Sequence, residues 1–380
     1  MTKRTLGIGL IGAGFMGKAH SAAYATMQMH VWPVPARPNL ACLADENPEA
    51  ARTGAERFGF ASFTSDWRAL IARPDVDIVD ICTPPNSHLE IALEAIQAGK
   101  HVLVEKPLAM NSEEARRMWQ AAERAGVKNL VGFSYRRTPA VLYARQLIDE
   151  GAIGRIYSFR GHYLQDWCVD PEAPRTWRHV ARIAGSGTLG DIGSHIIDIA
   201  RMMTGDIDSV VSLVRRWVDE RPETSTPGAH SVPVDVDDEA MFLAKFRDGA
   251  IGRIEASRFS HGRNNFLGFE INGEKGSITF NYEDMTKLGV FLAEGPVERR
   301  GLRVISTGPA HPYGQHLWPI PALGIGFTET KIIEVCDLFD GIVGDRRVRP
   351  DFEDGYRVSQ IVDAVESSGK LNNWVELDRD

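Results

Sequence analysis

The sequence is poor in cysteine, and it contains no long apolar run and no internal repeat. Only 4 of its 380 residues are cysteine. They lie far apart in the chain, at Cys42, Cys82, Cys168 and Cys336. Such spacing matches neither a disulfide framework nor a metal-binding or redox motif, so we expect free thiols and no metal. No apolar stretch approaches the length that crosses a bilayer, so the sequence predicts no membrane-spanning helix.

Basic clusters and a signal sequence are also lacking. There are 43 Lys and Arg residues against 51 Asp and Glu, a formal net charge of −8, and the basic residues form no block. Nucleic acid is therefore not an expected partner. Residues 1–4 run directly into a predicted strand, without the regions of a secretory signal. We expect a cytoplasmic protein without membrane attachment.

What is present is the composition of a globular protein long enough for two domains. The apolar fraction is 43% and the charged fraction 25%, as in ordinary folded proteins. Strands alternate with helices up to Phe133, and strands dominate afterwards. We therefore expect a Rossmann domain with a doubly wound parallel sheet over residues 1–133. An α+β domain with an open, largely antiparallel sheet should follow over residues 134–380.

Several local signals refine this outline. Asn47 should cap the helix that opens at Pro48, and Ser112 should cap a helix that runs to Ala125. Asp248-Gly249 and Asn272-Gly273 predict hairpins. The polar, proline-rich stretch 219–238 is predicted to be a long excursion, that is, a long connecting segment between two strands. Two helices, over 329–341 and 354–367, should close the chain.

A glycine pattern follows the first predicted strand, residues 6–11, and precedes a helix. It reads Gly12-x-Gly14-x-x-Gly17, with Phe15 and Met16 in the variable positions. In this context Gly12 permits a tight turn, Gly14 lets the backbone approach a pyrophosphate, and Gly17 lets helix and strand pack closely. The N–H groups of the helix N-terminus would bind the phosphates. The pattern predicts a dinucleotide site that includes these five residues.

An acidic residue at the end of the second strand specifies the nucleotide. Asp45 follows the predicted strand 40–44, where a carboxylate accepts hydrogen bonds from the ribose hydroxyls and repels a 2′-phosphate. The sequence therefore predicts NAD rather than NADP. The distance from Gly17 is long because of a proline-rich insertion, residues 31–38, that cannot lie inside a helix.

Two further turns should lie at the carboxyl ends of neighbouring strands, the edge at which open α/β sheets bind ligands. One contains Thr83, Pro84, Asn86 and His88, and the other contains Glu105 and Lys106 before Pro107. The position before proline disfavours helix, so Lys106 should be held by a rigid turn. We expect both turns to face the nicotinamide half of the cofactor. Tyr135 and Arg136 follow the last strand of the domain and should border the same cleft.

The second domain contains the other candidate site, in residues 187–198, which we interpret as a loop leading into a helix. Asp191 and His195 are four positions apart and so share a helical face. A carboxylate beside an imidazole favours the imidazolium and selects a tautomer. The alternative is an N-cap aspartate and a buried structural histidine. Together with Lys106 the pair would suffice to oxidise a secondary alcohol, one group taking the hydroxyl proton while the cation stabilises the alkoxide.

Aromatic and amide side chains near residue 165 have the character of a sugar site. Tyr163, Gln165, Trp167 and Trp177 offer apolar faces for C–H groups and polar tips for hydroxyls. The alternative is that alternate strand residues simply pack in a core. The segment 308–327 has no period and abundant Pro, Gly and aromatics. It should form a structured loop that caps the site or meets another subunit.

Three motifs carry a resemblance to a known family: Gly12-x-Gly14-x-x-Gly17, Glu105-Lys106-Pro107-Leu108 and Gly190-Asp191-Ile192-Gly193-Ser194-His195. In this combination, across essentially the whole chain, the sequence resembles the Gfo/Idh/MocA family of sugar and cyclitol dehydrogenases. The resemblance implies catalysis by Lys106, Asp191 and His195, with histidine as the acid/base. It also implies a cis Lys106–Pro107 bond.

Three other segments are similar to one branch of that family, which oxidises 1,6-anhydro-β-D-glucose at C3 with NAD. They are Trp32-Pro33-x-Pro35, residues 163–167 and residues 308–326. The similarity implies the same conversion to a 3-keto sugar. Other activities stay open: a different sugar or cyclitol dehydrogenase (for inositol or a glucoside), an NAD-dependent glycosidase, or a non-catalytic NAD-sensing regulator.

Assembly is predicted from the open sheet. Its predicted strands 210–217 and 240–246 carry too little charge for both faces to be hydrated. We therefore expect homodimers formed sheet to sheet, or pairs of these in a homotetramer.

Overall fold

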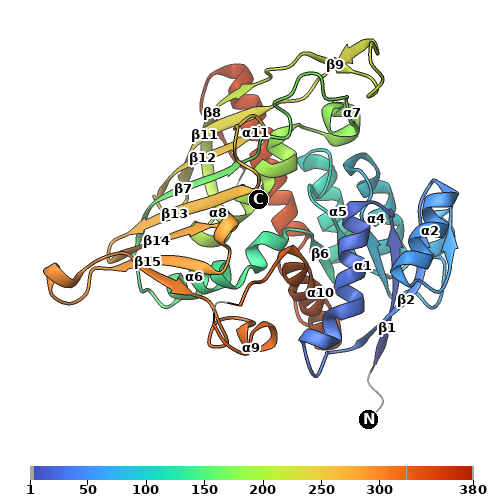
Figure 1. Cartoon of the computed structure of the whole chain (residues 1–380), viewed down its shortest axis with the longest axis horizontal. Coiled ribbons are helices and arrows are strands. Elements are labelled where there is room, and N and C mark those ends of the chain that lie inside the picture. The colour runs from blue at the N-terminus through green and yellow to red at the C-terminus, as the bar shows by residue number, and fades with distance from the viewer. Residues whose placement is uncertain (1–3, 322, 379–380) are drawn as a thin grey trace. The chain divides into compact units, whose positions relative to one another are not determined.

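The computed structural model of the chain describes residues 4–321 and 323–378 (Figure 1). Of the segments singled out above, residues 1–3 and Ala322 lie outside the described residues. The chain divides into two compact units, each built from two stretches of sequence. Unit 1 contains residues 1–137 and 325–357, and unit 2 contains residues 138–324 and 358–380. The sequence did not predict the return of 325–357 to unit 1, because helical periodicity does not say which sheet a helix covers.

Unit 1 is organised around a parallel sheet, as predicted. Its described strands lie in the order β3-β2-β1-β4-β5-β6, and every neighbouring pair is parallel. The order reverses beside β1, which is the switch point at which such sheets bind ligands. The strands are β1 (Thr5–Ile11), β2 (Arg37–Ala44), β3 (Phe63–Thr64), β4 (Ile78–Ile81), β5 (His101–Val104) and β6 (Asn129–Val131).

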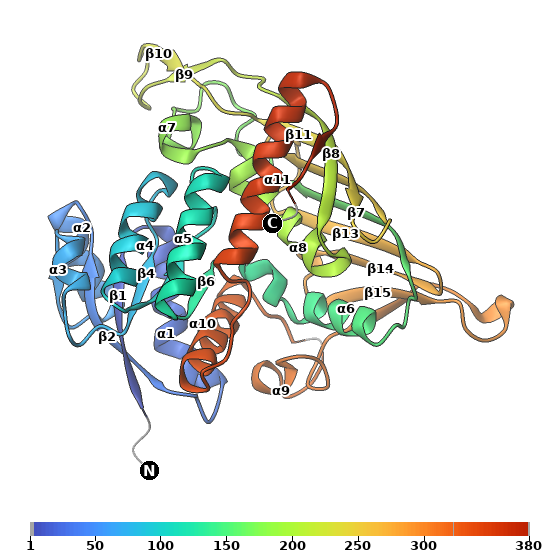
Figure 2. The same ribbon diagram turned by 180° about the vertical axis from the view of Figure 1, so that it is seen from behind.

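Helices cover both faces of this sheet. One face carries α1, α2 and α10, and the other carries α3, α4 and α5 (Figures 1 and 2). Tyr24 and Met27 of α1 pack in one buried cluster with Ile332 and Phe339 of α10. The helices are α1 (Phe15–His30), α2 (Pro48–Phe58), α3 (Trp67–Ile71), α4 (His88–Gln97), α5 (Ser112–Ala125) and α10 (Phe327–Val343).

Helix caps were predicted correctly at one position and wrongly at another. The Asn47 side chain accepts hydrogen bonds from Glu49 and Ala50, and so caps α2 as predicted. At α5 the cap is Asn111, whose side chain accepts from the N–H of Glu114 at 3.0 Å. Ser112 is already the first helical residue. Asparagine and serine are comparable caps, so composition alone did not separate the two neighbours.

Unit 2 contains an open mixed sheet, which confirms the largely antiparallel prediction. In the described part of the chain its strands lie in the order β16-β15-β14-β13-β7-β12-β11-β8-β17. Of these pairs, β7 with β12 is parallel and the others are antiparallel. The bounds are β7 (Ile156–Leu164), β8 (Ile207–Arg215), β11 (Glu239–Phe246), β12 (Ile251–Ser257), β13 (Phe266–Gly273), β14 (Gly276–Asn281), β15 (Lys287–Leu292), β16 (Arg303–Ser306) and β17 (Val375–Glu376).

The turns of unit 2 agree with the sequence only in part. Asp248-Gly249 joins β11 to β12, and Gly249 has the positive φ of 86° that favours glycine there. The β13–β14 hairpin also forms, but Asn272 and Gly273 end β13 and the turn is at residues 274–275. The excursion 219–238 contains a small hairpin of its own, β9 (Glu220–Pro222) with β10 (Ser231–Pro233).

One face of this sheet is covered by helices. They are α6 (Pro139–Asp149), α8 (Ser194–Thr204) and the second half of α11 (Phe352–Leu371) (Figure 2). Ser212 of β8 donates through its hydroxyl to Val365 O at 2.6 Å and so ties the sheet to α11. Two shorter helices, α7 (Ala181–Ala184) and α9 (Gly314–Leu317), lie in loops.

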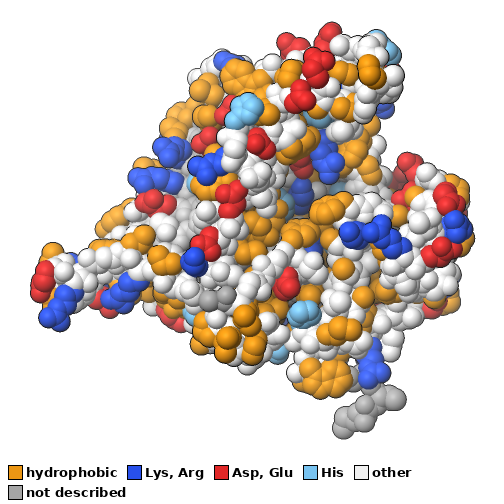
Figure 3. Space-filling model, in the orientation of Figure 1, with side chains coloured by type: hydrophobic (Ala, Val, Ile, Leu, Met, Phe, Trp, Pro, Cys, Tyr) orange, Lys and Arg blue, Asp and Glu red, His pale blue; other side chains and the backbone are white. Residues whose placement is uncertain are grey.

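Within the described ranges no helix is long and apolar enough to cross a membrane. On the face shown in Figure 3, Lys and Arg side chains are interspersed with Asp and Glu. The described residues of that face form no continuous basic surface.

Candidate active site

The glycine-rich loop of unit 1 has two glycines that the protein itself requires. Gly12 has φ of 106°, and a Cβ there would lie 2.8 Å from Cys82 O. A Cβ on Gly17 would lie 2.0 Å from Gly12 O, so no side chain fits between α1 and the loop. Both observations confirm the tight turn and the close helix–strand packing expected of this loop.

Gly14 is different, because a Cβ at this position would meet nothing within 4 Å. The residue precedes α1, whose N-terminus has no side-chain cap and no acidic residue in its first turn. The N–H groups of Phe15, Met16 and Gly17 therefore lie at the positive end of the helix and are not capped by the side chain of the preceding residue. A pyrophosphate fits there on charge and on room. Phe15, 71% exposed, stacks at 6.1 Å on Phe327.

Asp45 lies directly after β2 and is tied to the glycine-rich loop. One carboxylate oxygen accepts from Ala13 N–H at 2.9 Å, and the other accepts from Asn47 N–H at 3.0 Å. A carboxylate has about four acceptor positions, so two hydrogen bonds leave capacity for ribose hydroxyls. The residues present therefore fit an NAD molecule whose pyrophosphate lies at α1 and whose ribose lies at Asp45.

Cofactor preference gives a first prediction. Asp45→Ala should raise the KM for NAD and bring the kcat/KM values for NAD and NADP closer together, because the charge that repels a 2′-phosphate is lost. Asp45→Asn keeps an acceptor for Ala13 N–H and serves as the control that separates charge from loop anchoring. Steady-state kinetics with both cofactors measures the ratio. Equal kcat/KM for NAD and NADP in the unmodified protein would contradict the assignment.

The turns after β4 and β5 are joined by a buried histidine. His88 Nε2 lies 2.9 Å from Thr83 O, and Nδ1 lies 3.0 Å from Pro107 O. Burial lowers the pKa of His88, against the raising effect of these carbonyl groups. Pro84 and Asn86 are exposed. His88 therefore fixes the two turns to each other, and a direct contact of His88 with the cofactor stays a prediction.

Lys106 follows β5 in the second of these turns, and its bond to Pro107 is cis, as the family resemblance implied. The side chain of Glu105 is directed into the protein, with 4% of the residue exposed. Its carboxylate accepts from the backbone N–H of Lys106 at 3.1 Å. Glu105 thus supports the backbone that presents Lys106, and a direct contact of Glu105 with the cofactor stays a prediction.

Glu105 belongs to a buried charge network that the sequence did not predict. Lys331 Nζ lies 2.6 Å from Glu105 Oε1 and 2.9 Å from Glu334 Oε1. His20 places Nε2 3.1 Å from Glu105 and Nδ1 2.9 Å from Asp80. With a carboxylate at each ring nitrogen, His20 is doubly protonated. Burial lowers the pKa of His20, but Asp80 outweighs this effect and raises the pKa well above the usual value.

The same network contains the one group of potential metal ligands found among the described residues: His20, Asp80 and Cys82. Their ligand atoms already satisfy one another, since His20 bonds Asp80 and the Cys82 thiol lies 3.5 Å from both. Tyr24 donates its hydroxyl to Asp80 at 3.0 Å. Burial raises the pKa of Cys82 to about 12, so its thiol stays protonated. We interpret the group as a hydrogen-bonded network.

Tyr135 and Arg136 lie in a short 3₁₀ turn, η2 (Ser134–Arg137), directly after β6. Both are buried, with 8% of each residue exposed. The Tyr135 ring meets Phe327 edge on at 6.3 Å, and Arg136 lies 3.9 Å from Asp354. Their predicted contacts with substrate and cofactor stay predictions.

In unit 2, Asp191 and His195 lie where a π-helical turn, Leu189–Gly193, leads into α8. The turn is anchored by Asp237, whose carboxylate accepts from Gly187 N–H at 2.6 Å and from Leu189 N–H at 2.8 Å. Asp237 therefore caps this turn. The alternative interpretation of Asp191, as an N-cap aspartate, does not apply, because Asp191 lies inside the turn. π-helical turns occur frequently at functional sites.

The two candidate side chains differ in exposure. The side chain of Asp191 is 18% exposed and lies 3.6 Å from Arg258 and 3.8 Å from Arg178. His195 is buried, with 6% of the residue exposed, and its ring lies 6.0 Å from that of Tyr163. Unit 2 thus brings an acid, an imidazole and a phenol into one region, as the sequence predicted.

A hydrogen-bonded strip extends this region at the end of β7. Trp167 Nε1 donates to Gln165 Oε1 at 2.9 Å, and Gln165 Nε2 donates to Asn265 Oδ1 at 3.0 Å. Tyr163 donates its hydroxyl to the same Asn265 oxygen. Trp167 is 41% exposed. Trp167 presents an exposed aromatic face, whereas Tyr163 is buried with 2% exposed and helps to orient Gln165. An aromatic face beside an oriented amide suits a polyhydroxylated ligand.

Trp177 lies in η3 (Trp177–His179), and Arg178 stacks on its ring at 4.3 Å. His179 is buried beside Trp167, with ring centroids 5.8 Å apart. Burial, reinforced by the charges of Arg258 and Arg221, lowers the pKa of His179 to about 4. This second histidine is therefore neutral near pH 7 and is not a proton donor there.

A pH prediction follows from the residues beneath the π-helical turn. Burial, and then the charge of Asp237, raise the pKa of Glu366 to about 7, whereas it would be 4.5 unfolded. The contribution of the Glu366 carboxyl group to the free energy of unfolding is fully present below pH 4.5 and is lost as the pH rises through 7. Glu366→Gln should therefore raise the free energy of unfolding by about 1–3 kcal/mol at pH 8 and change it little at pH 5. Urea unfolding at both pH values measures this, and an equal effect at both would contradict it.

The segment 308–327 has structure in its described residues. It contains α9, and His311 packs edge on against Tyr143 at 4.7 Å. Trp318 is buried, with 3% exposed. The segment is therefore a folded loop of unit 2 up to residue 321. Its predicted role in covering the site or meeting a second subunit stays a prediction.

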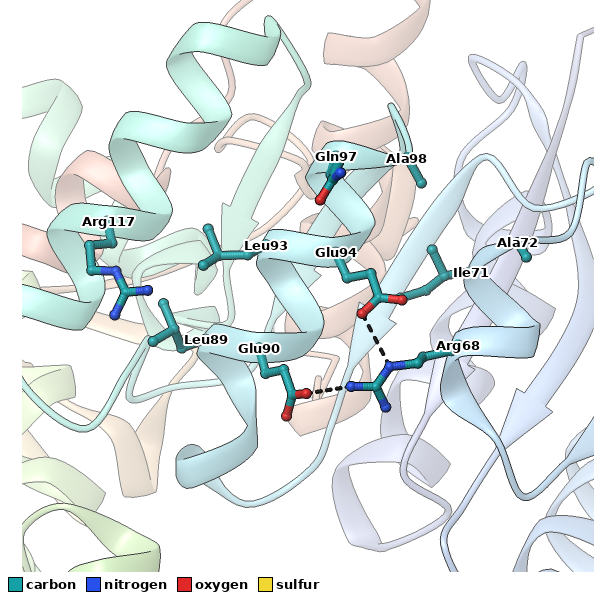
Figure 4. Close-up of a pocket in the computed structure, with 10 residues that line it drawn as sticks. All are labelled: Arg68, Ile71, Ala72, Leu89, Glu90, Leu93, Glu94, Gln97, Ala98 and Arg117. Atoms are coloured by element: carbon teal, nitrogen blue, oxygen red, sulfur yellow. Dashed lines mark hydrogen bonds and ion pairs between the residues drawn. The ribbon is translucent and has the colours of Figure 1, made fainter.

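A pocket of about 700 Å³ in unit 1 contains none of the predicted site residues. It lies against α3, α4 and α5 and is lined by Leu89, Leu93 and charged side chains (Figure 4). Arg68 is paired there with Glu90 and, at 3.3 Å, with Glu94. Because these charges neutralise each other and the sheet edge lies elsewhere, we assign the site by its chemistry rather than by this pocket.

The structure adds four residues that the sequence did not indicate: Lys331, Asp237, Arg258 and Asn265. Each acts on a predicted residue over a long sequence separation, such as 226 positions for Lys331 and Glu105.

A Rossmann unit with this glycine-rich loop and Asp45, joined to a sheet-rich second unit, defines an NAD-binding oxidoreductase. Two family models match the chain. The oxidoreductase family with NAD-binding Rossmann fold matches residues 6–133, and the GFO/IDH/MocA C-terminal domain matches residues 141–279. The chain belongs to the GFO/IDH/MocA family of oxidoreductases. The predicted family, fold class and cofactor are therefore confirmed.

Individual relatives are similar over the full length. Levoglucosan dehydrogenase of Pseudarthrobacter phenanthrenivorans is 51% identical, and the match covers 98% of each chain. A solved structure of levoglucosan dehydrogenase with NADH and levoglucosan is 52% identical with a TM-score of 0.96, covering 99% of this chain and 100% of the other. An oxidoreductase domain protein from Kribbella flavida is 44% identical with a TM-score of 0.95, covering 99% and 100%.

Proposed function

We propose that this protein oxidises the C3 hydroxyl of levoglucosan (1,6-anhydro-β-D-glucose) to the 3-keto sugar, with NAD as hydride acceptor. The observation that carries the proposal is the full-length likeness to levoglucosan dehydrogenase, at 51% identity over 98% of both chains. The oriented strip of Tyr163, Gln165 and Trp167 supports a sugar ligand independently.

The proposed chemistry assigns one role to each catalytic residue. His195 takes the proton of the C3 hydroxyl, and the ammonium of Lys106 stabilises the alkoxide as it forms. Asp191 orients His195 and stabilises its imidazolium. When bound, NAD supplies the acceptor for the hydride that leaves C3. Gln165 and Trp167 would bind the hydroxyl groups and a C–H face of the sugar.

The test is a substrate panel. The purified protein should produce NADH, followed at 340 nm, with levoglucosan at a kcat/KM well above that for D-glucose, myo-inositol or methyl β-D-glucoside. The product should be the 3-keto sugar by NMR. A preference for another member of the panel would replace the proposed substrate. Cleavage of a glycoside without net NADH would indicate a glycosidase, and NAD binding without turnover would indicate a regulator.

We also propose that the protein is a homo-oligomer formed through the uncovered face of the unit 2 sheet, as a dimer or as a tetramer of two dimers. Leu213, Met241, Leu243 and Ile251 are 43–63% exposed on adjacent strands of that face. Such neighbouring apolar side chains favour association. Sedimentation at micromolar concentration should detect more than the 42.0 kDa chain. Leu243→Lys should reduce the assembly, and a monomeric unmodified protein would contradict the proposal.

Free thiols at all four cysteines support a reducing compartment, the cytoplasm.

A further inference from the structure

Arg258, the residue directly after β12, is a fully buried cation with 0% of its surface exposed. Its Nη1 lies 3.6 Å from Asp191 Oδ2, and its Nη2 lies 3.8 Å from Asp238 Oδ1. Nη2 also donates to Asp237 O at 3.1 Å. The guanidinium lies 5.1 Å from the ring centroid of Trp167. The charge is therefore placed between one candidate catalytic acid and a second carboxylate.

A second buried arginine in the same region shows what a purely structural role looks like. Arg221 has 1% of its surface exposed. It donates to the backbone oxygens of Asp170 at 2.7 Å, Ala173 at 3.3 Å and Cys168 at 2.5 Å. It serves as a clamp on a loop, and no carboxylate forms an ion pair with it among the described residues.

Arg258 lacks such a clamp. Its Nε and Nη1 have no hydrogen-bond partner among the described residues. A buried guanidinium is costly unless its donors are satisfied or its charge is compensated. Since two of its nitrogens make no hydrogen bond, its compensation is mainly the attraction of nearby carboxylates. The fold therefore positions the charge of Arg258 without satisfying all of its hydrogen-bond donors.

We propose that Arg258 is a positioning residue for the oxidation: its charge holds the Asp191 carboxylate in place and limits how strongly that carboxylate stabilises the imidazolium of His195. The inference rests on the proposed function, in which neutral His195 accepts the hydroxyl proton. A base that is held too firmly in its protonated form cannot accept that proton, so a cation beside Asp191 keeps the base available near neutral pH.

The charged and titratable groups around this pair come from several elements. Those that bear on Asp191 and His195 are Tyr163 of β7, Cys168 after β7, Arg178 and His179 of η3, Asp237 and Asp238 before β11, and Arg258 after β12. Of the neutral members, His179 has its pKa lowered to about 4 and Cys168 has its pKa raised to about 11 by burial. Arg258 and Asp238 are buried charges of opposite sign, so their removal should move the acid limb of the pH profile of kcat/KM in opposite directions.

The experiment measures the acid limb of the pH profile of kcat/KM, with NAD and levoglucosan, in the full-length protein. Arg258→Met removes a positive charge, so the limb should move to higher pH by about one unit. Asp238→Asn removes a negative charge and keeps nearly the same side-chain shape, so the acid limb should move to lower pH. Arg221→Met is the matched control for loss of a buried arginine, and its limb should coincide with that of the unmodified protein. Thermal melts record folding for each variant.

The outcomes separate the inference from the proposed function. Opposite shifts for Arg258→Met and Asp238→Asn, with none for Arg221→Met, support the inference. If Arg258→Met does not fold, the shift to lower pH in Asp238→Asn still supports it. An unmoved limb, or a shift to higher pH, in folded Asp238→Asn overturns it. Asp191→Asn is measured beside them: full activity in that variant overturns the proposed site and the inference together, whereas a large loss there with unmoved limbs elsewhere overturns the inference alone.

Discussion

Replacement of His195 by alanine is expected to lower kcat by about 10²–10⁴-fold while the Kd for NAD stays nearly unchanged. The reason is that the residues predicted to bind the nucleotide belong to unit 1, whereas His195 belongs to α8 of unit 2. Lys106→Ala should produce a loss of the same order, because the alkoxide then lacks its stabilising cation. Single-turnover hydride transfer measures the chemical step, and fluorescence titration with NADH measures cofactor affinity.

The competing interpretation of His195 is structural, since 6% of the residue is exposed in a helix that packs on the sheet. It predicts a lowered melting temperature for His195→Ala with normal turnover per folded molecule. His195→Asn and a matched substitution one turn later, Ile199→Val, serve as controls for packing. Full turnover in folded His195→Ala would end the catalytic assignment.

Replacement of Lys331 by methionine is expected to destabilise unit 1 by about 3–5 kcal/mol, the usual cost of leaving a buried charge without its partner. Lys331 has 0% of its surface exposed and pairs with Glu105 and Glu334. Burial lowers the pKa of Lys331, but the two carboxylates outweigh this effect and raise the pKa above the usual value. Without the ammonium, Glu105 and Glu334 remain buried with His20 as their nearest cation.

Urea unfolding monitored by loss of NADH binding reports on unit 1 in this experiment. Arg52→Met is the matched control, because Arg52 pairs with Glu49 and Glu56 at an exposed site, where a pair contributes about 0–1 kcal/mol. Combining Lys331→Met with Glu334→Gln should recover part of the loss, since one unpaired charge is removed. A loss in Lys331→Met no larger than that in Arg52→Met would contradict the proposed importance of the buried pair.

The features that the sequence predicted well are those with a local cause. Gly12 and Gly249 have positive φ angles in tight turns, and Gly17 is required by its close approach to Gly12 O, five positions earlier. The place of Asp45 directly after β2 could be predicted because an apolar strand followed by an acidic residue is a local pattern, whereas its contact with the ribose stays a prediction. Even local reasoning failed where two residues compete, as Asn111 and Ser112 do for the cap of α5.

The features that the sequence could not predict depend on contacts between distant segments. Nothing near Lys331 distinguishes it from a surface lysine on an amphipathic helix, because its burial depends on the packing of α10 against α1. Arg258 ends a strand, where an arginine is usually hydrated. Its position beside Asp191 depends on how the sheet and the π-helical turn meet. Charges that tune a site are therefore harder to predict than the groups that perform its chemistry.

The two-part composition of each unit constrains the order of events during synthesis. Lys331 emerges 226 positions after Glu105, which corresponds to about 10–50 seconds at a ribosomal rate of about 5–20 residues per second. Unit 2 likewise cannot be completed until residues 358–380 have been synthesised. Neither unit can be complete on the ribosome before the last segment appears, so a stop codon near residue 325 should abolish both units at once. A fragment of residues 1–137 should likewise not serve as an independent nucleotide-binding module.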